Sequence, residues 1–111
     1  MDSKEHKLLD WLKHYTEASR NEVKRFADAL AKDAFNVHLL DQVFRPAAEV
    51  EVFGAAAKLL EQTPDVQDLK KIVTLQLIDA QFYPGKEVEA AYRREVGQVQ
   101  ARLIRLIDQL D

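Results

Sequence analysis

Apolar side chains repeat at heptad spacing through residues 86–111, and this pattern constrains the fold more than any other part of the chain. They recur at alternating steps of four and three residues, the spacing of a seam where helices pack together. At about 100° per residue, a polar face lies opposite the seam. The segment is therefore predicted to be a long amphipathic helix that packs against other helices. The seam consists of Tyr92, Val96, Val99, Leu103, Leu106 and Leu110, and the opposite face carries Arg94, Gln98, Arg102 and Arg105.

Capping residues predict where the first helices begin. Ser3 is a plausible N-cap, and Ser19 with Glu22 three residues later matches a capping box that could open a second helix. Because residues 18–21 contain no helix breaker, the two helices could equally be one. The apolar positions predicted to face the core here are Leu8, Trp11, Leu12, Tyr15, Val23, Phe26, Ala27 and Leu30.

Prolines divide the middle of the chain. Pro46 is expected to end or kink a helix. Thr63 is the expected N-cap of a helix that Pro64 opens. Gly54 should cost about 1 kcal/mol of helix propensity relative to alanine, and a close approach by a neighbouring helix is the expected compensation. The helices predicted in this part span residues 34–44, 47–61 and 64–82.

Residues 72–78 are apolar on almost every side and are expected to form the central helix. The alternation of Val73, Leu75 and Leu77 with polar residues also fits a strand. Helical spacing on both flanks, and the lack of a partner strand in the sequence, favour the helix. The expected fold is all-α, a single domain over residues 1–111. It is predicted to be a compact bundle of five or six helices with a long C-terminal amphipathic helix.

Composition narrows the possible functions. The chain has a formal net charge of −3 and no cysteine, with 47% hydrophobic and 32% charged residues. An acidic balance makes nucleic acid an improbable partner, and the missing thiols exclude disulfides and cysteine-bound metals. The apolar windows fall far short of the roughly 20 residues that cross a bilayer. A soluble, cytoplasmic protein with no membrane association is expected.

Catalytic and metal-binding patterns are weak. His6, Asp10 and His14 share one side of the first helix, but this side lies opposite the apolar stripe and should face solvent. Asp79 is the one carboxylate within an apolar run, and a structural hydrogen-bonding role is expected for it. Neither a nucleophile motif nor a glycine-rich phosphate loop is present in the sequence. No metal, cofactor or catalytic residue is predicted.

Residues 26–40 resemble a helix-turn-helix unit, with Ala27 at the crossing position and Leu30, Val37 and Leu40 at apolar positions. The pattern departs from the motif where Ala31 replaces the usual turn glycine. An ordinary helical hairpin explains the same spacing. A small DNA-binding regulator is therefore the alternative function, and a helical enzyme or ligand-binding domain is the third.

The preferred function is a non-catalytic protein–protein interaction module, an adaptor or regulatory subunit that acts through apolar helix faces. Self-association as a twofold dimer through the second half of the C-terminal helix is the simplest form of this prediction. Arg94, Arg102 and Arg105 could contact an acidic partner. The predicted interface comprises Tyr92, Val96, Val99, Leu103, Ile104, Leu106, Ile107 and Leu110.

Overall fold

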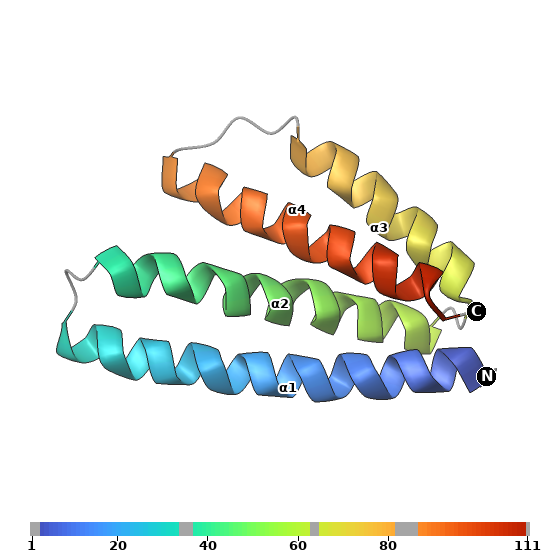
Figure 1. Cartoon of the computed structure of the whole chain (residues 1–111), viewed down its shortest axis with the longest axis horizontal. Coiled ribbons are helices and arrows are strands. Elements are labelled where there is room, and N and C mark those ends of the chain that lie inside the picture. The colour runs from blue at the N-terminus through green and yellow to red at the C-terminus, as the bar shows by residue number, and fades with distance from the viewer. Residues whose placement is uncertain (1–2, 34–36, 63–64, 82–86, 111) are drawn as a thin grey trace.

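The computed structural model describes residues 3–33, 37–62, 65–81 and 87–110, and within these ranges the protein is all-helical. Successive helices run antiparallel in an up-down-up-down order, so that α1 begins and α4 ends at the same end of the molecule (Figure 1). The described helices number four, not five or six. They are α1 (Ser3–Lys32), α2 (Val37–Gln62), α3 (Val66–Gln81) and α4 (Glu87–Asp108).

The helix count is lower than predicted because two expected breaks do not interrupt the helices. Helix α1 continues through Ser19, whose side chain is buried, so the capping-box pattern is not used as a cap. Helix α2 contains Pro46, which is fully buried. Proline removes one backbone hydrogen bond and costs about 3 kcal/mol or more in a helix interior. Packing of α2 along α1 and against α4 outweighs that cost.

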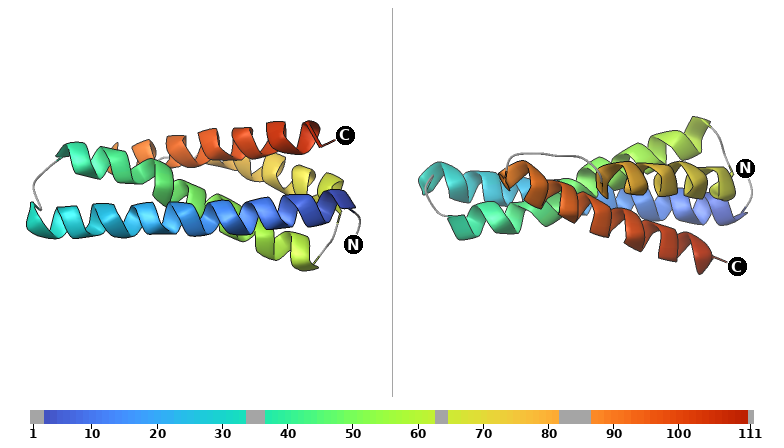
Figure 2. Two further views of the ribbon diagram at one scale, coloured as in Figure 1. Left: turned by 60° about the horizontal axis from the view of Figure 1, so that its bottom comes forward. Right: turned by 90° about the horizontal axis from the view of Figure 1, so that it is seen from above.

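The α1–α2 hairpin forms the base of the molecule, and α2 crosses α1 obliquely (Figure 2). Helix α4 packs on α2 and on α3, so two helices of the same chain cover it. The molecule measures 47 × 30 × 22 Å. At 1.5 Å per residue, the 30 residues of α1 account for about 45 Å of the longest dimension.

Helix α3 lies at the edge of the bundle, so the prediction of a central helix over residues 72–78 is wrong. It packs mainly on α4 and only slightly on α2. Its buried stripe is Val66, Leu69 and Val73, whereas Leu75 is 67% exposed. The alternative strand is also wrong, because these residues are helical. An apolar run shows that a segment is buried on at least one side, but it does not place that segment at the centre.

The start of α3 is capped by a different residue from the one predicted. Asp65 Oδ1 accepts a hydrogen bond from Gln67 N at 2.8 Å, which is N-cap geometry. Glu5 of α1 accepts one from Val66 N at 3.4 Å, so a buried carboxylate also faces the positive end of the α3 dipole. Thr63 and Pro64, the predicted cap and first helical residue, lie outside the described residues.

Gly54 does not mark an especially close helix crossing. A Cβ added there would lie 3.7 Å from Thr16 Cγ2, which is ordinary van der Waals contact. The expectation that a close approach requires glycine at this position is therefore wrong. Thr16 itself is buried and donates its hydroxyl hydrogen bond to Leu12 O within α1, at 2.6 Å.

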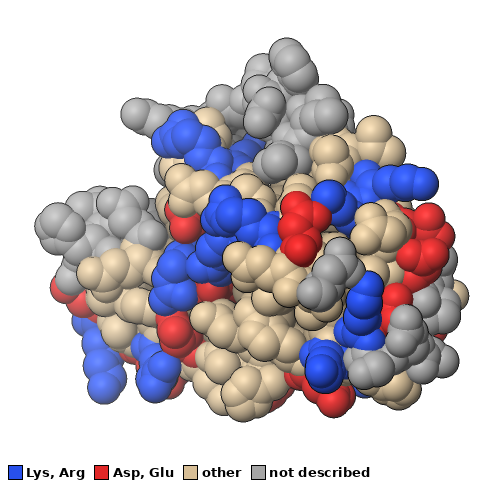
Figure 3. Space-filling view, turned by 45° about the vertical axis from the view of Figure 1, so that its right-hand side comes forward, with Lys and Arg blue, Asp and Glu red and all other residues tan. Residues whose placement is uncertain are grey.

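The surface carries mixed charges. Lys13 pairs with Glu61 at 2.8 Å, and Lys70 pairs with Asp108 at 2.5 Å, linking α1 to α2 and α3 to α4. On the face in Figure 3, acidic side chains lie among lysines and arginines and beside an uncharged area. That face is therefore not uniformly basic.

Candidate functional site: an aromatic groove bordered by arginines

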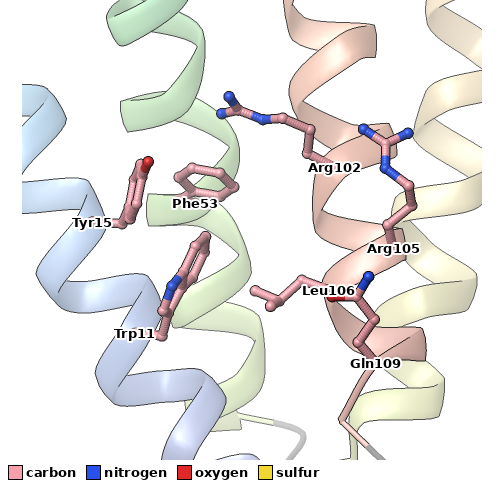
Figure 4. A pocket seen from close by; sticks show the side chains of 7 residues that line it. All are labelled: Trp11, Tyr15, Phe53, Arg102, Arg105, Leu106 and Gln109. Carbon is pink, nitrogen blue, oxygen red and sulfur yellow. The ribbon is translucent and has the colours of Figure 1, made fainter.

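A shallow groove lies between the α1–α2 hairpin and the second half of α4 (Figure 4). Its volume is about 270 Å³. Aromatic side chains from α1 and α2 form one wall, and α4 supplies the other. We call it the aromatic groove. Its lining residues are Trp11, Tyr15, Phe53, Arg102, Arg105, Leu106 and Gln109.

Three aromatic rings form the first wall. Trp11 and Tyr15 are four residues apart on α1, so they lie on one face and stack with ring centroids 4.6 Å apart. Both meet the Phe53 ring edge-to-face, at 5.2 and 5.5 Å. Phe53 is buried, whereas Tyr15 remains 38% exposed. The cluster is thus anchored in the core and presents aromatic surface to solvent.

Arg102 borders the groove from α4 and has a fixed position. Its guanidinium lies over the Phe53 ring, with Cζ 5.8 Å from the centroid. Its Nη2 donates to Glu49 Oε2 at 2.6 Å. Glu49 is only 1% exposed, so this hydrogen bond ties α4 to a buried carboxylate on α2. The ring and the carboxylate together orient Arg102.

Glu49 is tolerated in the interior because both of its oxygens accept from arginine. Arg45 Nη1 donates to Glu49 Oε1 at 2.5 Å, and Arg45 Nη2 donates to Glu22 Oε2 at 2.6 Å. Burial by itself would lower the pKa of Arg45, but the hydrogen bond to Glu22 and the charges of Glu49 and Glu22 outweigh it and raise the pKa. The network Glu22–Arg45–Glu49–Arg102 joins α1, α2 and α4 and contains equal numbers of positive and negative charges.

Arg105 differs from Arg102. It is exposed, and it has no acidic partner among the residues that the structure describes. Leu106 and Gln109 lie beside it in the lining. Of the predicted basic stripe, the structure brings Arg102 and Arg105 to the groove, whereas Arg94 is exposed outside it.

The predicted apolar interface on α4 is largely used inside the chain. Val99, Leu103 and Ile107 are core residues, with Ile107 2% exposed. The apolar arc of α4 is wide, and α2 and α3 cover it from two sides. Only Leu106 of the predicted set lines the groove. Leu106 and the other members outside the core are half-buried against it, namely Tyr92, Val96, Ile104, Leu106 and Leu110.

The length of α4 leaves no end of this helix outside the bundle. The described α4 has 22 residues, hence about 33 Å, while the molecule extends to 47 Å along α1. The second half of α4 therefore lies within the bundle.

Other predicted positions form no site within the described part of the chain. His6, Asp10 and His14 are all exposed, and no group of three or more potential metal ligands occurs among the described residues. The side chain of Asp79 lies outside the described part. None of the described helices has the length and apolarity that a bilayer crossing requires.

The helix-turn-helix resemblance corresponds to the tip of the α1–α2 hairpin. The two helices run antiparallel and cross only obliquely (Figures 1 and 2), whereas helix-turn-helix units cross at roughly 90–120°. Arg45, on the second helix of this pair, is paired with Glu22 and Glu49.

The aromatic groove was not predicted from the sequence, because Trp11 and Tyr15 were both assigned to a core-facing stripe. A signal was present: Trp11 and Tyr15 form an i, i+4 aromatic pair, and such residues are enriched in binding surfaces. No family model, curated protein or solved structure matches this chain significantly.

Proposed function

We propose that the protein is a non-catalytic protein–protein interaction module, an adaptor or regulatory subunit of the cytoplasm, which binds its partner through the aromatic groove. The observation that carries this proposal is the stacked Trp11–Tyr15 pair, with Tyr15 exposed, which lines one groove together with Arg105. Tryptophan, tyrosine and arginine are the residue types most enriched in the few positions that dominate binding energy.

Rigidity of the groove also supports the proposal. Phe53 anchors the aromatic pair in the core, and Glu49 holds Arg102 in place. A surface whose side chains are already ordered loses less conformational entropy when a partner binds. The groove is therefore better suited to docking than a surface of unrestrained side chains.

Affinity capture from the cells that make this protein, followed by mass spectrometry, tests the proposal. Wild-type protein and a His14→Ala control, changed at an exposed neighbouring position, should both retain a stoichiometric protein partner. Tyr15→Ala should lose it while keeping its helical circular dichroism spectrum. Recovery of nucleic acid, of no partner, or of a partner held equally by Tyr15→Ala would contradict the proposal.

A homodimer through α4 belongs to the same class of function. Because Ile107 lies in the core, the residues left for such an interface are half-buried ones, such as Ile104, Leu106 and Leu110. Size-exclusion chromatography with light scattering at tens of micromolar protein distinguishes a homodimer from a monomer by its mass, since the monomer has a mass of 12.7 kDa. A dimer that Leu106→Glu dissociates supports self-association, and a monomer excludes it.

A further inference from the structure

The lining of the aromatic groove is basic in an acidic protein. Two arginines and no carboxylate line it, although the whole chain has a formal charge of −3. The uncharged part of the lining is mostly aromatic and aliphatic. A ligand that complements this groove must therefore combine negative charge with apolar surface.

The two arginines contribute differently to that charge. Arg102 belongs to a network whose two arginines and two glutamates cancel, so it adds little net potential. Its guanidinium has five N–H donors, and the hydrogen bond to Glu49 uses Nη2, leaving other donors for an acceptor in the groove. Arg102 is thus a pre-oriented donor rather than a surplus charge.

Arg105 supplies the surplus charge. It lies one helical turn after Arg102, so the two guanidinium groups belong to neighbouring positions on the α4 surface. No described residue neutralises it. A planar guanidinium can bind a carboxylate through two parallel hydrogen bonds, which makes a carboxylate its best-matched ligand.

The size and shape of the groove favour a protein segment over a free small molecule. Its volume of about 270 Å³ is just below the roughly 300–1,000 Å³ of small-molecule pockets, and it is open to solvent. Such a space suits one or two side chains that project from a chain lying across the surface. The stacked rings of half-buried Trp11 and exposed Tyr15 offer an apolar surface for one of these side chains.

From this arrangement we infer that the aromatic groove binds an acidic segment of a partner protein in which a carboxylate lies next to a large apolar side chain. The apolar side chain packs on Trp11, Tyr15 and Leu106, and the carboxylate pairs with Arg105. The inference rests on the proposed function and specifies the chemistry of the partner.

The experiment is a selection of random 12-residue peptides that lack tryptophan, displayed against the immobilised full chain. Trp11 is the single tryptophan, so a change in intrinsic fluorescence reports occupancy of the groove. Selected synthetic peptides should be enriched in Asp or Glu beside Leu, Ile or Phe, and should alter Trp11 emission. Raising the salt concentration should weaken their binding.

Matched charge reversals identify the residue that recognises the acid. Arg105→Glu should lower the affinity for the acidic peptides about tenfold or more. Lys24→Glu makes the same charge change on the side of α1 opposite Tyr15 and should alter affinity less than about twofold. Replacing the peptide carboxylates with lysine should restore binding to Arg105→Glu.

The outcomes separate this inference from the function on which it rests. Selected peptides that change Trp11 emission but are basic or uncharged would overturn the acidic specificity. So would acidic peptides that bind Arg105→Glu as tightly as the wild type. In both cases the proposed function, a groove that binds a partner protein, would still stand. Failure to select any peptide that perturbs Trp11 overturns both. A dimer that Arg105→Glu converts to monomer identifies a second copy of this chain as the occupant and overturns the inference.

Discussion

Replacing Gly54 by alanine should stabilise this protein. Glycine in a helix interior costs about 1 kcal/mol relative to alanine. The added Cβ would lie 3.7 Å from Thr16 Cγ2, so it makes a favourable contact and no clash. We expect the free energy of unfolding to rise by about 1 kcal/mol. With an unfolding entropy of about 2.1 cal/mol/K per residue over 111 residues, the melting temperature should rise by about 4 °C.

Urea and thermal unfolding followed by circular dichroism measure both quantities. Ala55→Gly is the matched control, because Ala55 is exposed at the next position of α2 and its change reverses the substitution. It should lower the free energy of unfolding by about 1 kcal/mol. If Gly54→Ala lowered the melting temperature while Ala55→Gly behaved as expected, α1 and α2 would approach more closely than the geometry indicates, and the reasoning would be refuted.

Three further predictions concern other parts of the molecule. Burial, and then the hydrogen bond donated to Glu51, raise the pKa of Tyr92 in the folded protein. The free energy of unfolding should therefore fall as pH rises above about 10, because the tyrosine ionises first in the unfolded chain. In urea titrations Tyr92→Phe should reduce this fall, and an unchanged dependence of the free energy of unfolding on pH would contradict the assigned cause. In chemical unfolding, Ile107→Ala should lower the free energy of unfolding by about 2–5 kcal/mol, and Leu75→Ala should lower it by less than about 0.5 kcal/mol, because Ile107 is buried and Leu75 is exposed. Equal losses for the two variants would show that the core is wrongly assigned. Duplex DNA binding in gel-shift assays should be weak and non-specific at physiological salt, and tight sequence-selective shifts would favour the DNA-binding alternative.

The helical class and the amphipathic C-terminal helix could be predicted because both depend on local periodicity. The seam residues Val99 and Leu103 are buried as their spacing predicts. Helix boundaries were harder, since caps and prolines express only local preferences. At Pro46, burial of α2 against two helices outweighs the lost hydrogen bond, so a strong local breaker does not end the helix.

The sequence by itself determined that this chain forms amphipathic helices and which stripe of each is apolar, because a side chain's position on a helix follows from its spacing alone. Only the tertiary structure decided which stripes meet. It placed α3 at the edge, covered α4 from two sides and put Ile107 in the core. It also placed Trp11 and Tyr15 of α1 in the lining of one groove with Arg105 of α4, about 90 positions away in the sequence. Periodicity within one helix carries no information on its neighbours, and the groove exists only between helices.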